Sequence, residues 1–414
     1  ETAIVDAGGG ADGIAIDGQS DLQIDGITVQ GERGSGLNGG IALRAGATRI
    51  AIRHVVIRDN IANGIAVIDA SHVAITDSLI TRNAQGIQVR DWATHEGHQA
   101  GGPRSSDIEI SRNRIVANDI MVRNTPTPTY DDYGAQGVVL NVTDGPVLVE
   151  GNVIGSNTAT SYDYGRDGSN IEIFGASHVT MAGNTMFDSP TMLETGTHPS
   201  AAACAAKGLT GGACWVTANN GGTQPACEGN VMTRNVMYGG NDKSLVYLKN
   251  ASGTFRYQPY SAGILLHCGS NMTIAYNTID NMDHWAFDID ASDIYVAPIT
   301  NLRVADNIIS TDGELVYVLG SGLTASQLHF TTNTIWKGSL TDRVAKVASL
   351  GSGMVDFATF KASSGAAVSD RYNYKPLFVK RFAWSGDPLA AADYHVATTS
   401  PAIDSATPLG AAFD

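Results

Sequence analysis

A short pattern recurs along the chain and restricts its fold more than any other feature. It consists of an apolar residue, any residue, an apolar residue, two further residues, Asn, any residue and a final apolar residue. Its copies end at Ile115, Ile154, Met186, Ile279, Ile309 and Ile335, with a partial copy ending at Met232. Tight copies follow one another at about 22–24 residues, as from Gly64 to Gly86. A βαβ unit takes about 30 residues or more, so this period fits one coil of a β-solenoid instead.

The repeated Asn predicts a ladder within the solenoid. Coils stack about 4.8 Å apart with parallel hydrogen bonds, and alternate Ile, Val and Leu side chains point inward. An Asn repeated at one turn position can bond to the next coil through its side-chain amide. We expect a structural ladder, with no catalytic role, of Asn113, Asn152, Asn184, Asn230, Asn277, Asn307 and Asn333.

The repeats resemble those of the right-handed parallel β-helix proteins of the pectin-lyase-like superfamily, over roughly residues 3 to 404. This resemblance implies an all-β fold, with residues 1–414 in a single-stranded right-handed parallel β-helix. A large loop insertion is expected at 188–262 and a C-terminal cap segment at 369–414. The superfamily contains lyases, hydrolases, epimerases, esterases and phage tailspikes. The resemblance therefore implies action on polysaccharide, and the reaction has to be argued from the site.

Charge and cysteine content restrict the partners and the location. The formal net charge of -15 argues against nucleic acid as a partner, and no apolar stretch approaches the roughly 18–20 residues of a membrane span. The spacing of the cysteines lacks the CxxC of common zinc sites, so they predict disulfides, and the sequence leaves the pairing open. Disulfides favour a secreted, periplasmic or cell-surface protein. The four cysteines are Cys204, Cys214, Cys227 and Cys268.

Long insertions interrupt only the central coils. They span residues 91–107, 118–136, 157–170 and 188–262, and all lie beside the strand that carries GIQVR, GVVLN, NIEIF and GILLH in successive coils. Insertions in repeat proteins usually gather on the binding face. We therefore expect them to wall a groove above one sheet of the solenoid.

Period-two alternation predicts which side chains form the floor of that groove. The outward residues are Gln88, Arg90, Val139, Asn141, Glu172, Phe174, Leu265, His267, Asp288 and Asp290. Aromatic rings beside carboxylates and an Arg are typical of sugar binding, because sugars offer apolar faces and many hydroxyls. The predicted substrate-binding residues are Arg90, Trp92, Asp132, Tyr133, Asn141, Tyr164, Arg166, Glu194 and Trp285. Glu194 and Trp285 are expected just outside the ladder strands.

Paired carboxylates on this floor favour a glycoside hydrolase. Inverting hydrolases hold two carboxyl groups about 6.5–9.5 Å apart, and retaining ones about 5–5.5 Å. Neighbouring coils give about 5 Å and alternate coils about 10 Å. Glu172 and Asp288 are expected two coils apart on one row, which favours inversion. The predicted catalytic residues are Glu172, Asp288, Asp167, Asp290 and His267; no metal site is predicted and no cofactor is required.

Two alternatives stay open. A polysaccharide lyase or uronate epimerase needs a base and a cation beside the uronate carboxylate, and acidic loop residues could then hold calcium. The candidates for that chemistry are Arg90, Arg166, His267 and Tyr164. A non-catalytic carbohydrate-binding surface protein would need no carboxylate pair. Under each reading the predicted partner is a polysaccharide or oligosaccharide.

Overall fold

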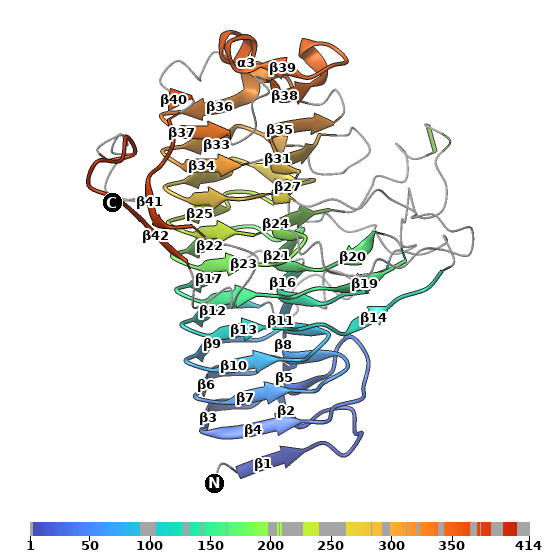
Figure 1. The fold of residues 1–414 in the computed structure, drawn as a ribbon. Coiled ribbons are helices and arrows are strands. Elements are labelled where there is room, and N and C mark those ends of the chain that lie inside the picture. The colour runs from blue at the N-terminus through green and yellow to red at the C-terminus, as the bar shows by residue number, and fades with distance from the viewer. Residues whose placement is uncertain are drawn as a thin grey trace.

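The strands of the protein stack into one column of coils in the computed structural model (Figure 1). Three long sheets form its sides, and we call them sheets A, B and C. The structure describes residues 3–91, 105–126, 132–141, 143, 145–162, 164–197, 205–206, 208, 227–239, 262–282, 284–291, 299–311, 313–319, 323–337, 343–364, 371–372, 374–381 and 392–403.

Sheet B is the sheet beside the insertions. Each strand pairs in parallel with its neighbours, except for an antiparallel contact between the last two. In order, the strands are β2 (Ile14–Asp17), β5 (Gly39–Arg44), β8 (Asn63–Ile68), β11 (Gln85–Arg90), β16 (Gln136–Asn141), β21 (Ser169–Phe174), β24 (Thr191–Gly196), β27 (Ala262–Leu266), β31 (Trp285–Asp290), β35 (Glu314–Leu319), β38 (Arg343–Val347) and β39 (Val355–Asp356).

Sheets A and C complete each coil. Sheet A contains β1 (Ala3–Asp6), β4 (Ile27–Gln30), β7 (Val56–Arg58), β10 (Leu79–Thr81), β13 (Arg114–Val116), β18 (Val153–Gly155), β23 (Thr185–Phe187), β26 (Val236–Tyr238), β30 (Thr278–Asp280), β34 (Ile308–Thr311), β37 (Thr334–Lys337) and β40 (Arg371–Tyr372). Sheet C contains β3 (Ser20–Asp25), β6 (Thr48–Arg53), β9 (Ser71–Thr76), β12 (Ser106–Ser111), β17 (Val147–Glu150), β22 (Val179–Ala182), β25 (Val231–Thr233), β29 (Thr273–Ala275), β33 (Leu302–Ala305) and β36 (Leu328–Thr331). The predicted all-β parallel β-helix is confirmed.

One apolar core runs through the column. Ile65, Ile87, Val138 and Ile171 follow one another in register on sheet B, and all four are fully buried. Stacking identical or similar branched side chains coil upon coil removes them from water and fills the interior at crystal-like density. The core therefore fixes which residues of each strand face outward.

An asparagine ladder closes the turn between sheets C and A. Each side-chain amide donates to the next Asn carbonyl at 2.9–3.2 Å. The prediction was wrong at Asn230: the ladder member is Asn235, and Asn230 instead accepts from the Val179 amide at 2.9 Å in the turn before sheet C. A second ladder, which the sequence pattern missed, joins Asn60, Asn83, Asn118, Asn157 and Asn170.

The range 188–262 contains a complete coil and is not one insertion, contrary to the prediction. Strands β24, β25 and β26 belong to sheets B, C and A, respectively. The copy of the repeat in this coil ends at Met237, five residues after the partial copy read from the sequence. Of this range, the structure describes residues 188–197, 205–206, 208, 227–239 and 262. One more coil therefore separates the earlier strands of sheet B from the later ones.

The C-terminal region both covers the last coil and returns along the column. Helix α3 (Phe357–Ser364) lies against the last coils, with Phe360 buried edge-on against Phe330 at 5.6 Å. Within the predicted cap segment 369–414, β40 extends sheet A, and strands β41 (Phe378–Lys380) and β42 (Asp393–Val396) lie beside that sheet (Figure 1). In the part of the chain that is described, no helix is both long enough and apolar enough to cross a membrane.

Candidate active site

A cleft lies above sheet B. Two hairpins that project from the column supply part of its lining, and Figure 1 shows their strands. The hairpins are β14 (Met121–Arg123) with β15 (Tyr133–Gly134), and β19 (Ala159–Ser161) with β20 (Gly165–Asp167). They lie in the predicted insertions 118–136 and 157–170. The cleft is lined by Asp132, Tyr133, Gln136, Tyr164, Arg166, Asp167, Gly168, Ser169, Glu172, Pro190, Thr191 and Glu194. Seven of the predicted site residues therefore come together here.

The coil register corrects the expected spacing of the carboxylates. Glu172 pairs with Glu194, Glu194 with Leu265, and Leu265 with Asp288. Glu172 and Asp288 are thus three coils apart, not two, which is about 14 Å along the stack. Glu194 lies within β24 and Trp285 begins β31, so neither is outside the ladder strands as predicted. Strand β24 was not predicted because its sequence, TMLETG, does not alternate apolar with polar residues.

A break in alternation creates a further outward row on sheet B. A side chain at Gly86 would point into the column, where a Cβ would lie 2.4 Å from the Gly137 carbonyl oxygen. Because residues 86 and 87 both face inward, Gln85 before them faces outward, and its side chain bonds to that of Gln88. Alternation is broken in the same way at Ala286, which is buried and faces inward, so Trp285 before it faces outward. Sheet B therefore presents three outward rows and not the two that strict alternation gives.

A chain of three glutamines holds Glu172. The Gln88 amide donates to Gln85 at 3.1 Å, Gln85 donates to Gln136 at 2.6 Å, and Gln136 Nε2 donates to Glu172 Oε2. We call these residues the glutamine chain; all three are buried. An ionised carboxylate only accepts hydrogen bonds, so Glu172 sets the orientation of each amide in turn. An amide donor also stabilises the ionised form of a carboxylate.

Glu194 lies in a different environment from Glu172, although the two are direct neighbours across the strands. Burial raises the pKa of Glu194, and the nearby charge of His267 partly opposes this. Thr191 Oγ1 donates weakly to its carboxylate at 3.4 Å. Two adjacent carboxyl groups thus have different surroundings, an amide donor at Glu172 and desolvation at Glu194, and acid–base chemistry uses such differences.

His267, Asp288 and Asp290 form a second cluster beyond Leu265. His267 Nδ1 lies 3.4 Å from Asp290 Oδ2. Burial raises the pKa of Asp288 to about 7, against the opposing effect of His267 and with a further increase from Asp290. Burial disfavours the imidazolium of His267, but Asp290, Glu194 and Asp288 outweigh it and raise the pKa of His267. The three predicted residues are therefore brought together, and His267 is the basic group among them.

The hairpin residues of the cleft are held by local bonds. Arg166 is 4% exposed; its Nη2 donates to Asp188 at 2.9 Å, and its Nη1 has no partner among the described residues. Asp132 accepts from the backbone amides of Thr125 and Tyr162 at 2.7 and 3.1 Å, which ties the two hairpins together. Asp167 accepts from the Gly168 amide at 2.7 Å. Asp132 and Asp167 thus shape the wall of the cleft through the backbone.

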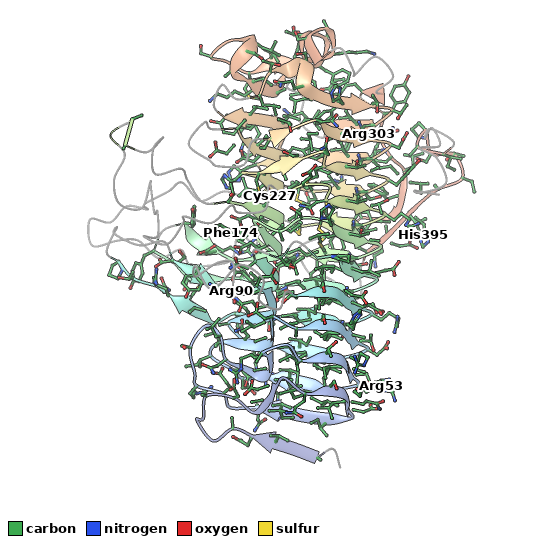
Figure 2. All side chains as sticks on the ribbon, turned by 180° about the vertical axis from the view of Figure 1, so that it is seen from behind. Arg53, Arg90, Phe174, Cys227, Arg303 and His395 are labelled. Atoms are coloured by element: carbon green, nitrogen blue, oxygen red, sulfur yellow. A yellow bond between two sulfur atoms is a disulfide. The ribbon has the colours of Figure 1, made fainter. Side chains whose placement is uncertain are left out.

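The remaining predicted residues have separate positions. Arg90 and Asn141 are register partners on the outward face of sheet B, and Figure 2 shows Arg90 on the side from which the hairpins project. Tyr133 is 37% exposed, and the Arg123 guanidinium lies 5.3 Å from its ring centroid. Trp285 stacks on Tyr317, which the sequence did not indicate. Trp92 lies outside the described residues.

A disulfide joins Cys227 to Cys268. Both sulfurs are buried, and Cys268 follows His267 directly, so the bond anchors the end of β27 beside the second cluster. Cys204 and Cys214 lie outside the described residues. Within the described ranges, no three His, Cys, Asp or Glu side chains are grouped so that they could hold a metal ion. Calcium binding by the acidic loop residues stays a prediction.

A family model described as "Right handed beta helix region" matches residues 5–186, in agreement with the fold. Among solved structures, the chain is similar to the tailspike of E. coli bacteriophage HK620 in complex with a pentasaccharide. The TM-score is 0.44 at 9% identity, over 84% of this chain and 58% of that one. It is also similar to the catalytic unit of a thermostable GH87 α-1,3-glucanase from Streptomyces thermodiastaticus. There the TM-score is 0.41 at 12% identity, over 81% of this chain and 59% of that one. No curated protein sequence matches the chain.

Proposed function

We propose that the protein is a carbohydrate-active enzyme that hydrolyses a glycosidic bond in the cleft above sheet B. One observation carries the proposal: Glu172 and Glu194 are direct register partners and line the same cleft. Neighbouring coils are about 4.8 Å apart, close to the 5–5.5 Å that separates the carboxyl groups of retaining hydrolases. This pair replaces the pairing of Glu172 with Asp288, because three coils are too many for either known spacing.

The environments of the two carboxyl groups assign their roles. Glu172, which accepts from Gln136, is the nucleophile: it attacks the anomeric carbon and forms a glycosyl ester. Glu194, whose pKa is raised by burial, gives its proton to the leaving oxygen as the glycosidic bond breaks. Water then attacks the ester, gives its proton to Glu194 and releases Glu172. The positive charge of His267 stabilises the ionised Glu194 between these steps.

The lining of the cleft supports a sugar as the ligand. Tyr133 and Tyr164 bring aromatic surface beside the carboxylates, and Arg166 brings a buried guanidinium. Flat apolar rings and charged hydrogen-bond donors together match the two kinds of surface that a sugar ring presents. The Cys227–Cys268 disulfide supports a secreted, periplasmic or cell-surface location, because oxidising compartments preserve such bonds.

A second pair supports the inverting form of the same reaction. Glu194 and Asp288 are two coils apart on one outward row, about 10 Å, near the upper end of the inverting range. The pKa of Asp288, raised to about 7, suits a proton donor at neutral pH. In this form Asp288 would protonate the leaving oxygen and Glu194 would activate water. The two forms give products of opposite anomeric configuration.

The test is incubation with a panel of neutral and acidic polysaccharides. Reducing ends and absorbance at about 232–235 nm are followed together, and proton NMR records the anomer released first. Reducing ends without absorbance are expected, with retention of configuration. Inversion would move the catalytic pair to Glu194 and Asp288. Absorbance that rises with the reducing ends would instead support the lyase alternative and its bases. No change on any polymer would remove the support for hydrolysis.

A further inference from the structure

An aromatic pair stands on sheet B beyond the second cluster. The rings of Trp285 and Tyr317 are stacked, with centroids 4.8 Å apart and planes 20° from parallel. Trp285 lies on the same strand as Asp288, and Tyr317 is the register partner of Asp288 on the next coil. Both side chains are partly exposed. We call this pair the aromatic platform.

The geometry of the coils makes the aromatic platform rigid. The centroid separation matches the spacing of about 4.8 Å between coils, and the two rings come from neighbouring strands: Trp285 is opposite Glu314, and Tyr317 is opposite Asp288. On the far side of the pair, Lys346 Nζ lies 4.8 Å from the Tyr317 centroid. On the near side, the register partner of Trp285 is Ala262, which contributes only a methyl group from the strand. One coil nearer to Glu194, the neighbours are therefore the small Ala262 on the row of Trp285 and Leu265 on the row of Tyr317.

We infer that the aromatic platform is a distal sugar-binding subsite that stacks a neutral sugar ring of the same chain that is cut in the cleft. The inference rests on the proposed function. A rigid aromatic face loses little conformational freedom on binding and offers apolar area to the C–H face of a sugar. Trp285 is two coils from Glu194, about 10 Å, so the ring that it binds is not the ring being cleaved.

The charges around the aromatic platform select a neutral ring over a uronate. Asp288 and Asp290 are on the same strand as Trp285, and Glu194 is two coils away. Glu314, the register partner of Trp285, pairs with Lys337 at 2.7 Å. Desolvation already raises the pKa of Glu194 and Asp288 on this side, so a uronate brought towards the cleft would lose hydration in the same way and would meet the like charge of Asp290. A neutral hexose ring keeps the stacking contact without that repulsion.

Binding is measured apart from turnover, in the full chain carrying Glu172→Gln. The probes are laminarin, dextran, pullulan and polygalacturonate, each cast into affinity gels. Trp285→Ala is expected to weaken retardation by at least one neutral polymer by about tenfold, while Trp285→Tyr stays within about threefold, since it keeps an aromatic face. Trp336→Phe is the matched control. Trp336 lies on sheet A under Lys375 and Arg381 and should leave binding unchanged.

Each outcome separates the subsite from the reaction. Unchanged retardation of Trp285→Ala, retardation by polygalacturonate alone, or no retardation of the parent chain by any neutral polymer would overturn the inference. Selective loss of retardation in Trp285→Ala would support the subsite, whatever the turnover of the Glu172→Gln parent. Full turnover in Glu172→Gln would count against the proposed hydrolysis and would leave the subsite standing. With active enzyme, kcat/KM should rise with oligosaccharide length, and Trp285→Ala should abolish the rise. Length dependence that survives the substitution would also contradict the inference.

Discussion

At the scale of single residues, the site depends on carboxyl groups with the same chemistry in different surroundings. Glu172 accepts from an amide, Glu194 is desolvated beside an imidazolium, and Asp288 is desolvated between a cation and another carboxylate. Burial and neighbouring charge act on the protonation of each group separately. The row of outward positions on sheet B therefore holds acids with different tasks, although the backbone presents them identically.

Replacing either carboxyl group of the proposed pair by its amide should abolish most of the turnover. Glu172→Gln removes the nucleophile and Glu194→Gln removes the acid, so we expect each to lower kcat by about a hundredfold or more. Thermal unfolding should change little, because both side chains reach the cleft. Reducing-end assays and calorimetry would measure the two effects. Glu150→Gln, at an exposed position on sheet C, is the matched control. Near-normal rates in both cleft variants would refute the pairing.

Asp288 should make the stability of the protein depend on pH. Its pKa rises from 3.8 in the unfolded chain to about 7 in the fold. A folded carboxyl group with a raised pKa binds a proton more tightly than the unfolded one. The protonated Asp288 therefore adds to the free energy of unfolding at pH below about 4, and this stabilisation decreases as the pH rises to about 7.

Asp288→Asn should remove that pH dependence. The gain in stability of the variant over wild type should grow between pH 4 and pH 8, by on the order of 4 kcal/mol at most. Urea titrations at several pH values would measure it. An equal difference between the two proteins at all pH values would show that the carboxyl group titrates normally.

At the scale of elements, strands β11, β16 and β21 act together through their outward side chains. The glutamine chain crosses all three strands and ends on Glu172. The same tripeptide, Ala84–Gln85–Gly86 and Ala135–Gln136–Gly137, spans the start of two of these strands, and it was a usable sequence signal for the missed residues. The glycine faces inward and the glutamine outward at the same point of each coil. The same backbone feature, an outward glutamine followed by an inward glycine, therefore recurs on successive coils and produces a row of polar side chains.

A substitution in the glutamine chain should disturb Glu172 more strongly, the closer the replaced glutamine lies to that carboxylate. Gln136→Leu removes the donor to the carboxylate, so the acidic limb of the kcat/KM profile should move to higher pH and turnover should fall about tenfold or more. Gln85→Leu should have a smaller effect, because it only frees Gln136 to rotate. Gln23→Leu, on the exposed face of sheet C, is the control. A fall in turnover without movement of the acidic limb would indicate a structural role alone.

At the scale of the whole molecule, the column is tied along its side by the returning C-terminal strands. Asp280 at the end of β30 is fully buried, and it accepts from Arg381 at 2.6 Å and from the Tyr394 hydroxyl at 2.8 Å. The Tyr394 ring also packs on Tyr238, with centroids 5.0 Å apart. Residues more than a hundred positions apart in the chain therefore clamp the central coils on sheet A, away from the cleft above sheet B.

Removing the cation from this contact should destabilise the fold without changing the reaction. Arg381→Met leaves Asp280 buried without its charge partner, which we expect to cost about 2 kcal/mol, less than for a fully buried pair because the Arg is partly exposed. Urea denaturation would measure the loss, and kcat at 25 °C should stay unchanged. The double variant Asp280→Asn with Arg381→Met should recover part of the stability. Full stability in the single variant would show that Tyr394 suffices.

The sequence by itself determined the coil, the inward rows and the position of the hairpins that wall the cleft. These follow from local patterns: a period of about 22–24 residues, alternating apolar side chains, and insertions beside one strand. Hydrophobic burial acts on every coil in the same way, so a repeated pattern is sufficient to predict it.

Only the tertiary structure decided which outward residues meet. The position of Glu194 next to Glu172 depends on a polar strand that no apolar pattern marks, and one missed coil moved Asp288 by about 4.8 Å along the stack. The outward direction of Trp285 depends on a break in alternation at the residue after it. Contacts between coils join residues tens of positions apart. Their register depends on the length of every intervening loop, and local preferences do not fix that length.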